Sequence, residues 1–238
     1  MNDPRMSGQW TMPTAPPDSV ERVAGFLRAV YGWMCLGLGL TAMVAFQVAN
    51  TPALVSRLMS NQLLYVGLML GELGLVFYLS ARVTRLAAET AAALFVLYAA
   101  LNGITLSLVV LAYTGQSVAD TFAVTSGMFG AMALFGSATK RNLSGVGQFM
   151  YMGLVGLVLA SLVGLFWHNG TLQFLISGVG VLVFTGLAAW DAQRLKQMAL
   201  AVPEGQTRSL AIVGALSLYL DFINLFLSLL QFVGNRRE

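Results

Sequence analysis

Long apolar runs separated by short polar connections are the main pattern along this chain. A helix needs ~20 residues to cross a bilayer, and its backbone polar groups must then be satisfied within the helix. The connections are too short to hold a second folded domain. The pattern therefore predicts an all-α, polytopic membrane protein with one bundle of seven transmembrane helices, at Phe26 to Ala49, Leu63 to Leu79, Ala87 to Ala112, Thr121 to Ala138, Met150 to Trp167, Leu172 to Trp190 and Ile212 to Phe232.

The last apolar run carries an acidic residue, Asp221, near its middle. A carboxylate at the centre of a spanning helix costs about 2.5 to 3.5 kcal/mol on insertion scales, so such acids usually face the bundle interior and have a function there. Polar residues recur at steps of three and four around it, which places them on one helix face. The run therefore predicts a helix with a polar seam, formed by Ser217, Asp221, Asn224, Ser228 and Gln231.

A second acid, Asp191, ends the sixth run. Consecutive spanning helices are antiparallel, so Asp191 and Asp221 belong to neighbouring helices in the same half of the membrane. They can meet if the sixth helix continues past Trp190, and no helix breaker follows Asp191. Two carboxyls in a low-dielectric site cannot both ionise cheaply, so a shared proton would make the pair a pH-responsive clasp. The alternatives are an ordinary i,i+3 ion pair of Asp191 with Arg194, and an Asp221 that serves helix packing alone.

Other polar residues within the runs are few. Glu72 lies midway along the second run, and we expect it to face the bundle interior. Arg82 closes the same run, either as an anchor that sets the topology or as a residue that reaches the acids. Tyr98, Asn102 and Thr105 form a polar row on the third helix, which favours interhelical hydrogen bonding.

Composition supports a membrane protein. Hydrophobic residues make up 57% of the 238, charged residues make up 10%, and the mean hydropathy is +0.75. A soluble domain of this size cannot hide so much apolar surface from water. The formal net charge of +3 does not indicate nucleic-acid binding, because the basic residues are spread over connections without interleaved aromatics.

The first 25 residues differ from the rest, because they are rich in proline and polar residues. They predict a flexible cytoplasmic tail (residues 1–25) ahead of a transmembrane domain (residues 26–238). The single cysteine, Cys35, lies within the first run and is interpreted as an apolar packing residue.

Lys and Arg are distributed unequally between the two sides, which predicts a cytoplasmic N-terminus. Only Arg57, Arg236 and Arg237 then fall on the outer side. The terminal pair is unexpected there, so a last helix that stops short is the alternative to a full crossing. The cytoplasmic side receives Arg5, Arg22, Arg28, Arg82, Arg85, Lys140, Arg141, Arg194, Lys196 and Arg208.

Four segments together resemble the Bax inhibitor-1 family in its bacterial branch. The resemblance runs from about Val30 to the C-terminus. It rests on the order and spacing of residues 100–107 (ALNGITLS), 139–145 (TKRNLSG), 184–194 (FTGLAAWDAQR) and 215–226 (ALSLYLDFINLF).

The resemblance implies seven helices with the last one surrounded by the others, and a pH-sensitive calcium leak. It places a two-aspartate sensor at Asp191 and Asp221 and a latch arginine at Arg82. It also links one bacterial relative to a membrane-bound protease. The implied setting is the bacterial inner membrane.

These observations converge on a pH-sensitive cation pathway, not an enzyme. The aspartates would bind Ca²⁺ weakly and transiently, with Glu72, Ser217 and Asn224 lining the path, and no other cofactor is expected. The partners would be the lipid bilayer, calcium ions and a membrane-bound protease. A non-conducting regulator of another membrane protein is the alternative. An intramembrane aspartyl protease is disfavoured, because the Gly-x-Gly-Asp and Tyr-Asp contexts are absent around Asp191 and Asp221.

Overall fold

The computed structural model describes residues 17–82, 86–167, 170–201 and 207–237. Seven helices in these residues are long and apolar enough to span a membrane, which confirms the predicted all-α, seven-span architecture. One further helix, α2, is too short to span. The elements are α1 (Pro17–Ala49), α2 (Pro52–Ser60), α3 (Gln62–Arg82), α4 (Ala88–Ala112), α5 (Gly115–Ala138), α6 (Ser144–Phe166), α7 (Gly170–Ala201) and α8 (Thr207–Val233).

Several helices extend beyond the apolar runs. The helix α5 begins at Gly115, α6 begins at Ser144, and α7 continues to Ala201. Polar residues at a membrane boundary keep helical backbone hydrogen bonds, and long basic side chains reach the interface from there. The extension of α7 matters most, because it places Asp191 well inside the helix.

The first helix also begins earlier than predicted. Residues 17–25, assigned to the tail from their composition, belong to α1, which starts at Pro17. Proline is well tolerated in the first turn of a helix, since the N–H that it lacks has no intrahelical partner there. Residues 1–16 of the predicted tail lie outside the described residues.

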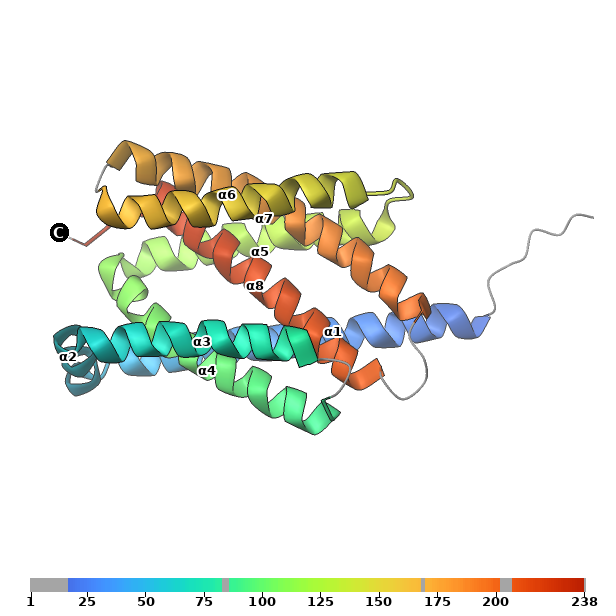
Figure 1. Cartoon of the computed structure of the whole chain (residues 1–238), viewed down its shortest axis with the longest axis horizontal. Helices are drawn as coiled ribbons and strands as arrows, with labels where there is room; N and C mark the ends of the chain where they lie inside the picture. Colours follow the sequence, from blue (N-terminus) through green and yellow to red (C-terminus); the bar gives the residue numbers. More distant parts are fainter. Residues whose placement is uncertain (1–16, 83–85, 168–169, 202–206, 238) are drawn as a thin grey trace, which may run out of the picture.

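The short helix α2 connects α1 to α3 and was not predicted. Its nine residues form about two and a half turns that begin at Pro52, and only Leu58 is buried. Such a segment is too short to register as an apolar run, and its sequence mixes polar and apolar residues. It lies at one end of the bundle (Figure 1).

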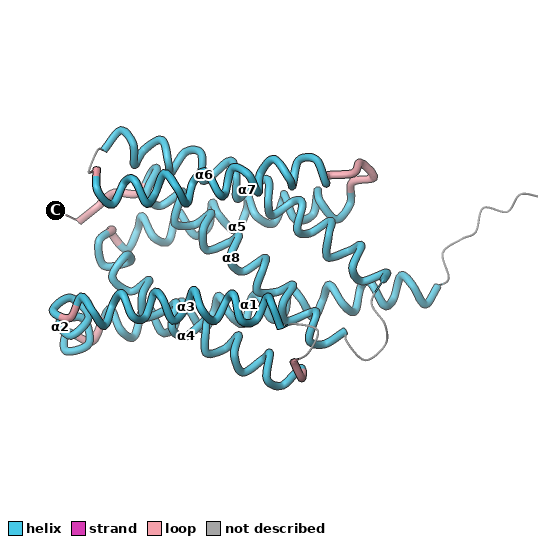
Figure 2. Tube along the Cα trace, in the orientation of Figure 1, coloured by secondary structure: helices cyan, strands magenta, loops and turns pink. Residues whose placement is uncertain are grey.

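The last helix runs through the centre of the bundle. In its most apolar stretch α8 is 67% buried, whereas the corresponding value for the peripheral helix α3 is 6%. In Figure 1, α8 (red) crosses diagonally between two groups of helices, one containing α1, α3 and α4 and the other α5, α6 and α7. The same arrangement is visible in the trace of Figure 2, and α8 packs against α1, α4, α5 and α7. The central last helix that the resemblance implied is therefore confirmed.

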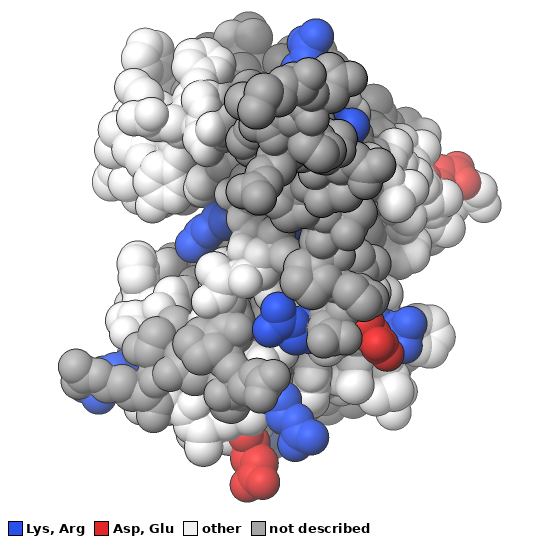
Figure 3. Space-filling view, turned by 90° about the vertical axis from the view of Figure 1, so that its right-hand side faces the viewer, with Lys and Arg blue, Asp and Glu red and all other residues white. Residues whose placement is uncertain are grey.

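Basic side chains gather at one end of the bundle, which we call the basic end. It holds the C-terminal ends of α3, α5 and α7 and the starts of α1, α4, α6 and α8 (Figure 1). Figure 3 looks onto this end and shows Lys and Arg at several separate places, with few acidic side chains between them. Its described basic residues are Arg22, Arg28, Arg82, Lys140, Arg141, Arg194, Lys196 and Arg208.

The opposite end is closed by the C-terminus. The Thr114 N–H donates to the Asn235 carbonyl (3.1 Å), and the Arg237 N–H donates to the Ala112 carbonyl (3.0 Å). Tyr113 and Arg236 form an isolated antiparallel bridge, and the Arg236 guanidinium lies over the Tyr113 ring. The chain after α8 is thus fixed to the α4–α5 connection, far from the basic end, so α8 passes through the whole bundle.

Candidate functional site

The polar seam of α8 faces α7. Ser217 donates a 2.6 Å hydrogen bond to Asp191 Oδ2, and the Ser177 hydroxyl donates to Gln231 Oε1 (3.3 Å). Between these contacts, Ser228 packs on the backbone of Gly180, where no larger residue would fit. Asn224 is the exception in the predicted seam, since its side-chain amide donates to the Leu220 carbonyl of its own helix (2.8 Å).

The seam brings two carboxyl groups into contact. Asp191 on α7 is 6% exposed and Asp221 on α8 is 7% exposed, and their side chains lie within hydrogen-bonding reach of each other. If both groups are ionised, Asp191 Oδ1 and Asp221 Oδ2 have no hydrogen-bond donor among the described residues. Two ionised carboxylates at contact in a low-dielectric interior repel, and a single proton held between them supplies the missing donor.

One cation lies beside the pair. Arg194 Nη1 is 3.9 Å from Asp191 Oδ1, one helical turn along α7. The Arg194 side chain is 55% exposed and also stacks over the Trp190 ring. Its interaction with Asp191 is therefore at the limit of an ion pair and is weakened by solvent. The predicted alternative of an Asp191–Arg194 pair is present, but it coexists with the contact to Asp221.

Small residues allow neighbouring helices to approach α7 at this level. Gly136 of α5 lies directly on the Ala189 carbonyl, and Gly147 of α6 lies against the Trp190 ring. A Cβ atom at either glycine would overlap its neighbour. The Ala189 backbone and the Trp190 ring, directly before Asp191, are thus each packed against a glycine with no space for a Cβ atom, which fixes the position of Asp191.

Gln193 connects α7 to the α5–α6 connection. Its amide donates to the Arg141 carbonyl and its Oε1 accepts from the Leu143 N–H, both at 2.8 Å. The position was missed from the sequence, because glutamine near a helix end usually faces solvent. Here it is 7% exposed and ties the basic-end connection to the helix that carries Asp191.

A second buried acid, Glu72, lies elsewhere in the bundle, between α3 and α4. Thr105 Oγ1 donates to Glu72 Oε1 (2.9 Å), and Asn102 Nδ2 donates to Glu72 Oε2 (3.3 Å). Asn102 and Thr105 of the predicted polar row of α4 therefore serve interhelical hydrogen bonding, as expected. Both oxygens of Glu72 are occupied, so this acid differs from the aspartate pair.

The Glu72 cluster continues to α8 and α1 through Tyr219. The Tyr219 hydroxyl donates to Asn102 Oδ1 (3.1 Å) and lies 2.7 Å from Thr41 Oγ1, which donates to the Ala99 carbonyl (2.8 Å). Tyr219 and Thr41 have one hydroxyl hydrogen each, so two hydrogens are shared among these three oxygen–oxygen contacts. Neither Tyr219 nor Thr41 stands out in the sequence, because each lies within an apolar run and is flanked directly by apolar residues.

Arg82 does not contact the aspartates. It ends α3 at the basic end and is exposed, and α3 packs mainly against α4 and α2, in the other group of helices from α7 (Figure 1). The described cation beside Asp191 is Arg194 on the same helix. The structure thus brings Asp191, Asp221 and Ser217 together, holds Glu72 in a separate cluster, and leaves Arg82 at the periphery.

The aspartate pair has too few ligands to be a tight metal site. Among the residues that the structure describes, no three His, Cys, Asp or Glu side chains form a group that could hold a metal ion. Two carboxyls and one hydroxyl offer oxygen ligands, which hard cations prefer, but Ca²⁺ takes six to eight of them. The pair can therefore hold a cation only with water completing its shell.

Fold and site together define a polytopic helical membrane protein with a carboxyl pair buried between its last two helices. The family model described as "Inhibitor of apoptosis-promoting Bax1" matches residues 23–238. The chain belongs to the Bax inhibitor-1 family, as its sequence motifs predicted.

Three bacterial relatives illustrate this membership. The inner membrane protein YbhL of Escherichia coli K12 is 48% identical over 215 residues, covering 89% of this chain and 92% of that protein. Uncharacterized proteins of Deinococcus radiodurans and Borreliella burgdorferi are 44% and 40% identical, covering 92% and 90% of this chain and 94% and 93% of their own lengths. The chain is an integral membrane protein like the first of these.

Proposed function

We propose that the protein is a pH-sensitive calcium leak whose path is gated by Asp191 and Asp221. The observation that carries the proposal is the buried contact of two carboxyl groups from adjacent helices, each with one oxygen that lacks a donor. A purely structural polar contact would be expected to satisfy its buried oxygens, as Glu72 does.

The pair supplies a two-state element. When the carboxyls share one proton, the hydrogen bond between them holds α7 against α8. Loss of that proton leaves two negative charges in contact, and their repulsion favours separation of the helices. Addition of a second proton removes the charge that attracts a cation. Flux therefore depends on the protonation of the pair.

A weak cation site follows from the same groups. With the pair ionised, its carboxylates and the nearby Ser217 hydroxyl present oxygen atoms to an entering Ca²⁺. Glu72 and the half-buried Asn224 would line the remaining path. Conduction requires weak binding, because an ion must leave as readily as it enters.

We place the protein in the inner membrane with its basic end in the cytoplasm. The bias of Lys and Arg supports this orientation, because cytoplasmic connections carry an excess of basic residues. The E. coli relative is named an inner membrane protein. Neither that name nor the family description denotes an enzyme.

Arg82 is proposed as a latch that reaches the ionised pair from the basic end. In the present conformation Asp191 faces Asp221 and Ser217, so the latch requires α3 to move towards α7 after proton loss. Arg82→Ala should then raise the basal calcium leak and weaken its pH dependence. An unchanged leak in a normally folded variant would leave Arg82 as a topology anchor.

The test is calcium flux into liposomes loaded with a calcium dye, measured between about pH 6 and 8. Asp221→Asn keeps the shape of the side chain but fixes that site neutral, so flux should become nearly independent of pH. Glu89→Gln, at an exposed acid in the first turn of α4, is the matched control and should behave like the parent.

Two outcomes would overturn the proposal. If Asp221→Asn kept the full pH response, the sensor would lie elsewhere, and Glu72 would be the next residue to test. If the parent protein carried no calcium at any pH, a non-conducting regulator that binds another membrane protein, such as a membrane-bound protease, would become the better explanation.

A further inference from the structure

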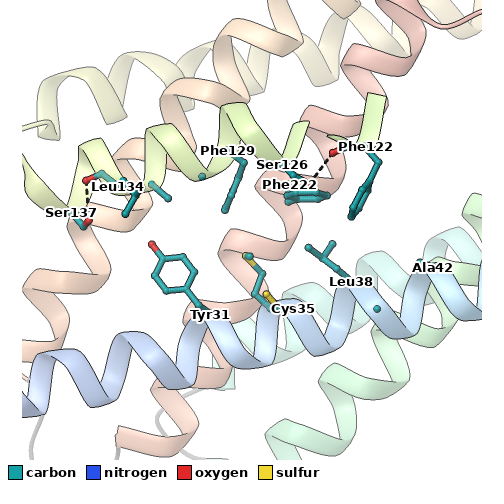
Figure 4. A pocket seen from close by; sticks show the side chains of 14 residues that line it. Tyr31, Cys35, Leu38, Ala42, Phe122, Ser126, Phe129, Leu134, Ser137 and Phe222 are labelled. Carbon is teal, nitrogen blue, oxygen red and sulfur yellow. Dashed lines mark hydrogen bonds between the residues drawn. The ribbon is translucent and has the colours of Figure 1, made fainter. Parts of the chain in front are cut away.

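An apolar groove lies between α1 and α5, away from both acid centres. Its volume is about 600 Å³, within the range of pockets that hold a small-molecule ligand. The helices α1 and α5 both pack against α8 but hardly against each other. Figure 4 shows the two helices facing one another, with Phe222 of α8 between them at the back of the groove.

The groove is open to the surrounding membrane. Met34, Phe129 and Ala133 form a buried floor, while Cys35 and Leu134 are exposed at the rim. The other lining residues are mostly small or apolar, and Figure 4 shows the Tyr31 side chain projecting from α1 towards α5. Since the lining lies within spanning helices, its exposed part faces lipid. Lipid acyl chains are therefore the molecules that can enter the groove from its surroundings.

The length of the groove matches one leaflet. On α1 its lining runs from Tyr31 to Ala42, and on α5 from Phe122 to Ser137. At 1.5 Å per residue these stretches are about 16 and 22 Å long, and half of a ~30 Å hydrocarbon core is about 15 Å. Ser137 and Tyr31 mark the end of the groove nearest to the basic end.

Basic groups surround that end. Lys196 of α7 donates a hydrogen bond to the Ser137 carbonyl (2.7 Å), which leaves two ammonium hydrogens for another acceptor. Arg28 lies one turn before Tyr31 on the same face of α1, and Lys140 follows the end of α5. Both are exposed. The mouth of the groove is thus positive, and the groove itself is apolar.

We propose that this groove binds one anionic phospholipid, with an acyl chain between α1 and α5 and the phosphate at Arg28, Lys140 and Lys196. Lipid tails are as apolar as the groove, so the tail contributes packing and the charge of the headgroup contributes selectivity. A zwitterionic lipid fits the same groove but lacks net charge. The inference does not depend on whether the protein conducts calcium.

Two glycines of α5, one in the lining and one outside it, permit a steric test. A Cβ atom at Gly130 of α5 meets no atom within 4 Å, so a larger side chain there extends into the groove without a clash. Gly127, on the same helix but outside the lining, is equally open and provides the matched control. Both Gly130→Leu and Gly127→Leu should fold, which thermal unfolding in detergent verifies.

The experiment is native mass spectrometry of the purified full chain in detergent with equimolar phosphatidylglycerol and phosphatidylcholine of identical acyl chains. The parent and Gly127→Leu should retain one phosphatidylglycerol in preference to phosphatidylcholine. Gly130→Leu should lose that preference. Arg28→Gln and Lys140→Gln should each lower it about fivefold, the effect of one basic group near a lipid surface, whereas Arg208→Gln at the start of α8 should not.

Cys35 then locates the bound lipid, because it is the only cysteine of the chain and lines the groove. Phosphatidylglycerol should slow alkylation of Cys35 in the parent and in Gly127→Leu, and phosphatidylcholine should slow it less. Equal retention of the two lipids by the parent would overturn the proposal. A lipid-free dimer of the parent that dissociates in Gly130→Leu would also overturn it, because the groove would then be an interface between two copies.

Discussion

The two buried acid centres of this bundle are built on opposite principles. Glu72 accepts from a hydroxyl and an amide, both neutral donors, so its oxygens are satisfied whatever happens elsewhere. Asp191 and Asp221 face each other, and one oxygen of each is left without a donor. The first arrangement stabilises one conformation, whereas the proposed function requires the second to hold a proton between its carboxyl groups. If the proposed function is correct, what each acid faces distinguishes a static polar contact from a switch.

The helix α8 contributes to both centres. Tyr219 reaches the Glu72 cluster, and Asp221, two residues later, faces α7. Successive helical residues are about 100° apart, so two positions suffice to point the side chains to different partners. The helix is thus held on one side by fixed hydrogen bonds and on the other by the carboxyl pair, which the proposed function makes dependent on pH. The following predictions test whether the two sides are independent.

The largest effect on stability is expected beside the aspartate pair, at Gly136. Gly136→Leu would push a side chain into the Ala189 carbonyl, so α5 must separate from α7, at a cost of about 3 kcal/mol or more. The same change at Gly127 meets open space and should be close to neutral. Thermal unfolding in detergent measures both variants. Equal stabilities of the Gly136→Leu and Gly127→Leu variants would show that α5 can shift at little cost and does not fix the position of Asp191.

A smaller effect is expected at Glu72. Glu72→Ala leaves the Asn102 amide without an acceptor and should cost about 1 to 3 kcal/mol, while Thr105 can still donate to the Asn102 carbonyl (3.0 Å). Glu72→Gln retains an acceptor and should recover most of that stability. Asp221→Asn provides an amide that can donate to Asp191 in place of the shared proton, so it should cost less than Glu72→Ala. The reverse order of stabilities would mean that the aspartate pair, not Glu72, is the structural centre.

The smallest effect is expected for Tyr219→Phe. Loss of the hydroxyl removes the donor to Asn102 Oδ1 but frees Thr41 to donate to the Ala99 carbonyl, so the net cost should be about 1 kcal/mol. The pH response of calcium flux should be unchanged, since Asp221 keeps its partners. A shift of the pH response in this variant would show that the two centres are coupled through α8.

Much of this architecture could be predicted from the sequence, because spanning helices and intramembrane acids leave strong local signals. The seven spans, the polar seam of α8 and the polar row of α4 were each visible from spacing alone. The missing parts depend on tertiary contacts. Gln193 looks like a surface residue, α2 is too short for an apolar run, and Tyr219 lies among leucines. The two side chains bond residues that are distant in the sequence. Tyr219 and Asn102 are 117 residues apart, and Gln193 and Leu143 are 50 residues apart.

The boundary between the tail and the first helix was predicted at residue 25, but α1 already begins at Pro17. Prolines indicated an irregular segment up to residue 25, but a proline at the start of a helix does not interrupt it. Arg82 shows a different limit. The end of α3 at the basic end was predicted correctly, yet a position along one helix says nothing about the lateral distance to α7.

The bridge between the C-terminus and the α4–α5 connection makes α8 a lever. Residues 235 and 237 are hydrogen-bonded to that connection, so α8 would pivot about its C-terminal end, just beyond Val233. At 1.5 Å per residue, Asp221 lies about 18 Å from Val233 and Thr207 lies about 39 Å from it. If the aspartates separate while the bridge holds, the start of α8 travels about twice as far as the carboxyl group. A movement too small to open the centre of the bundle would still displace its basic end.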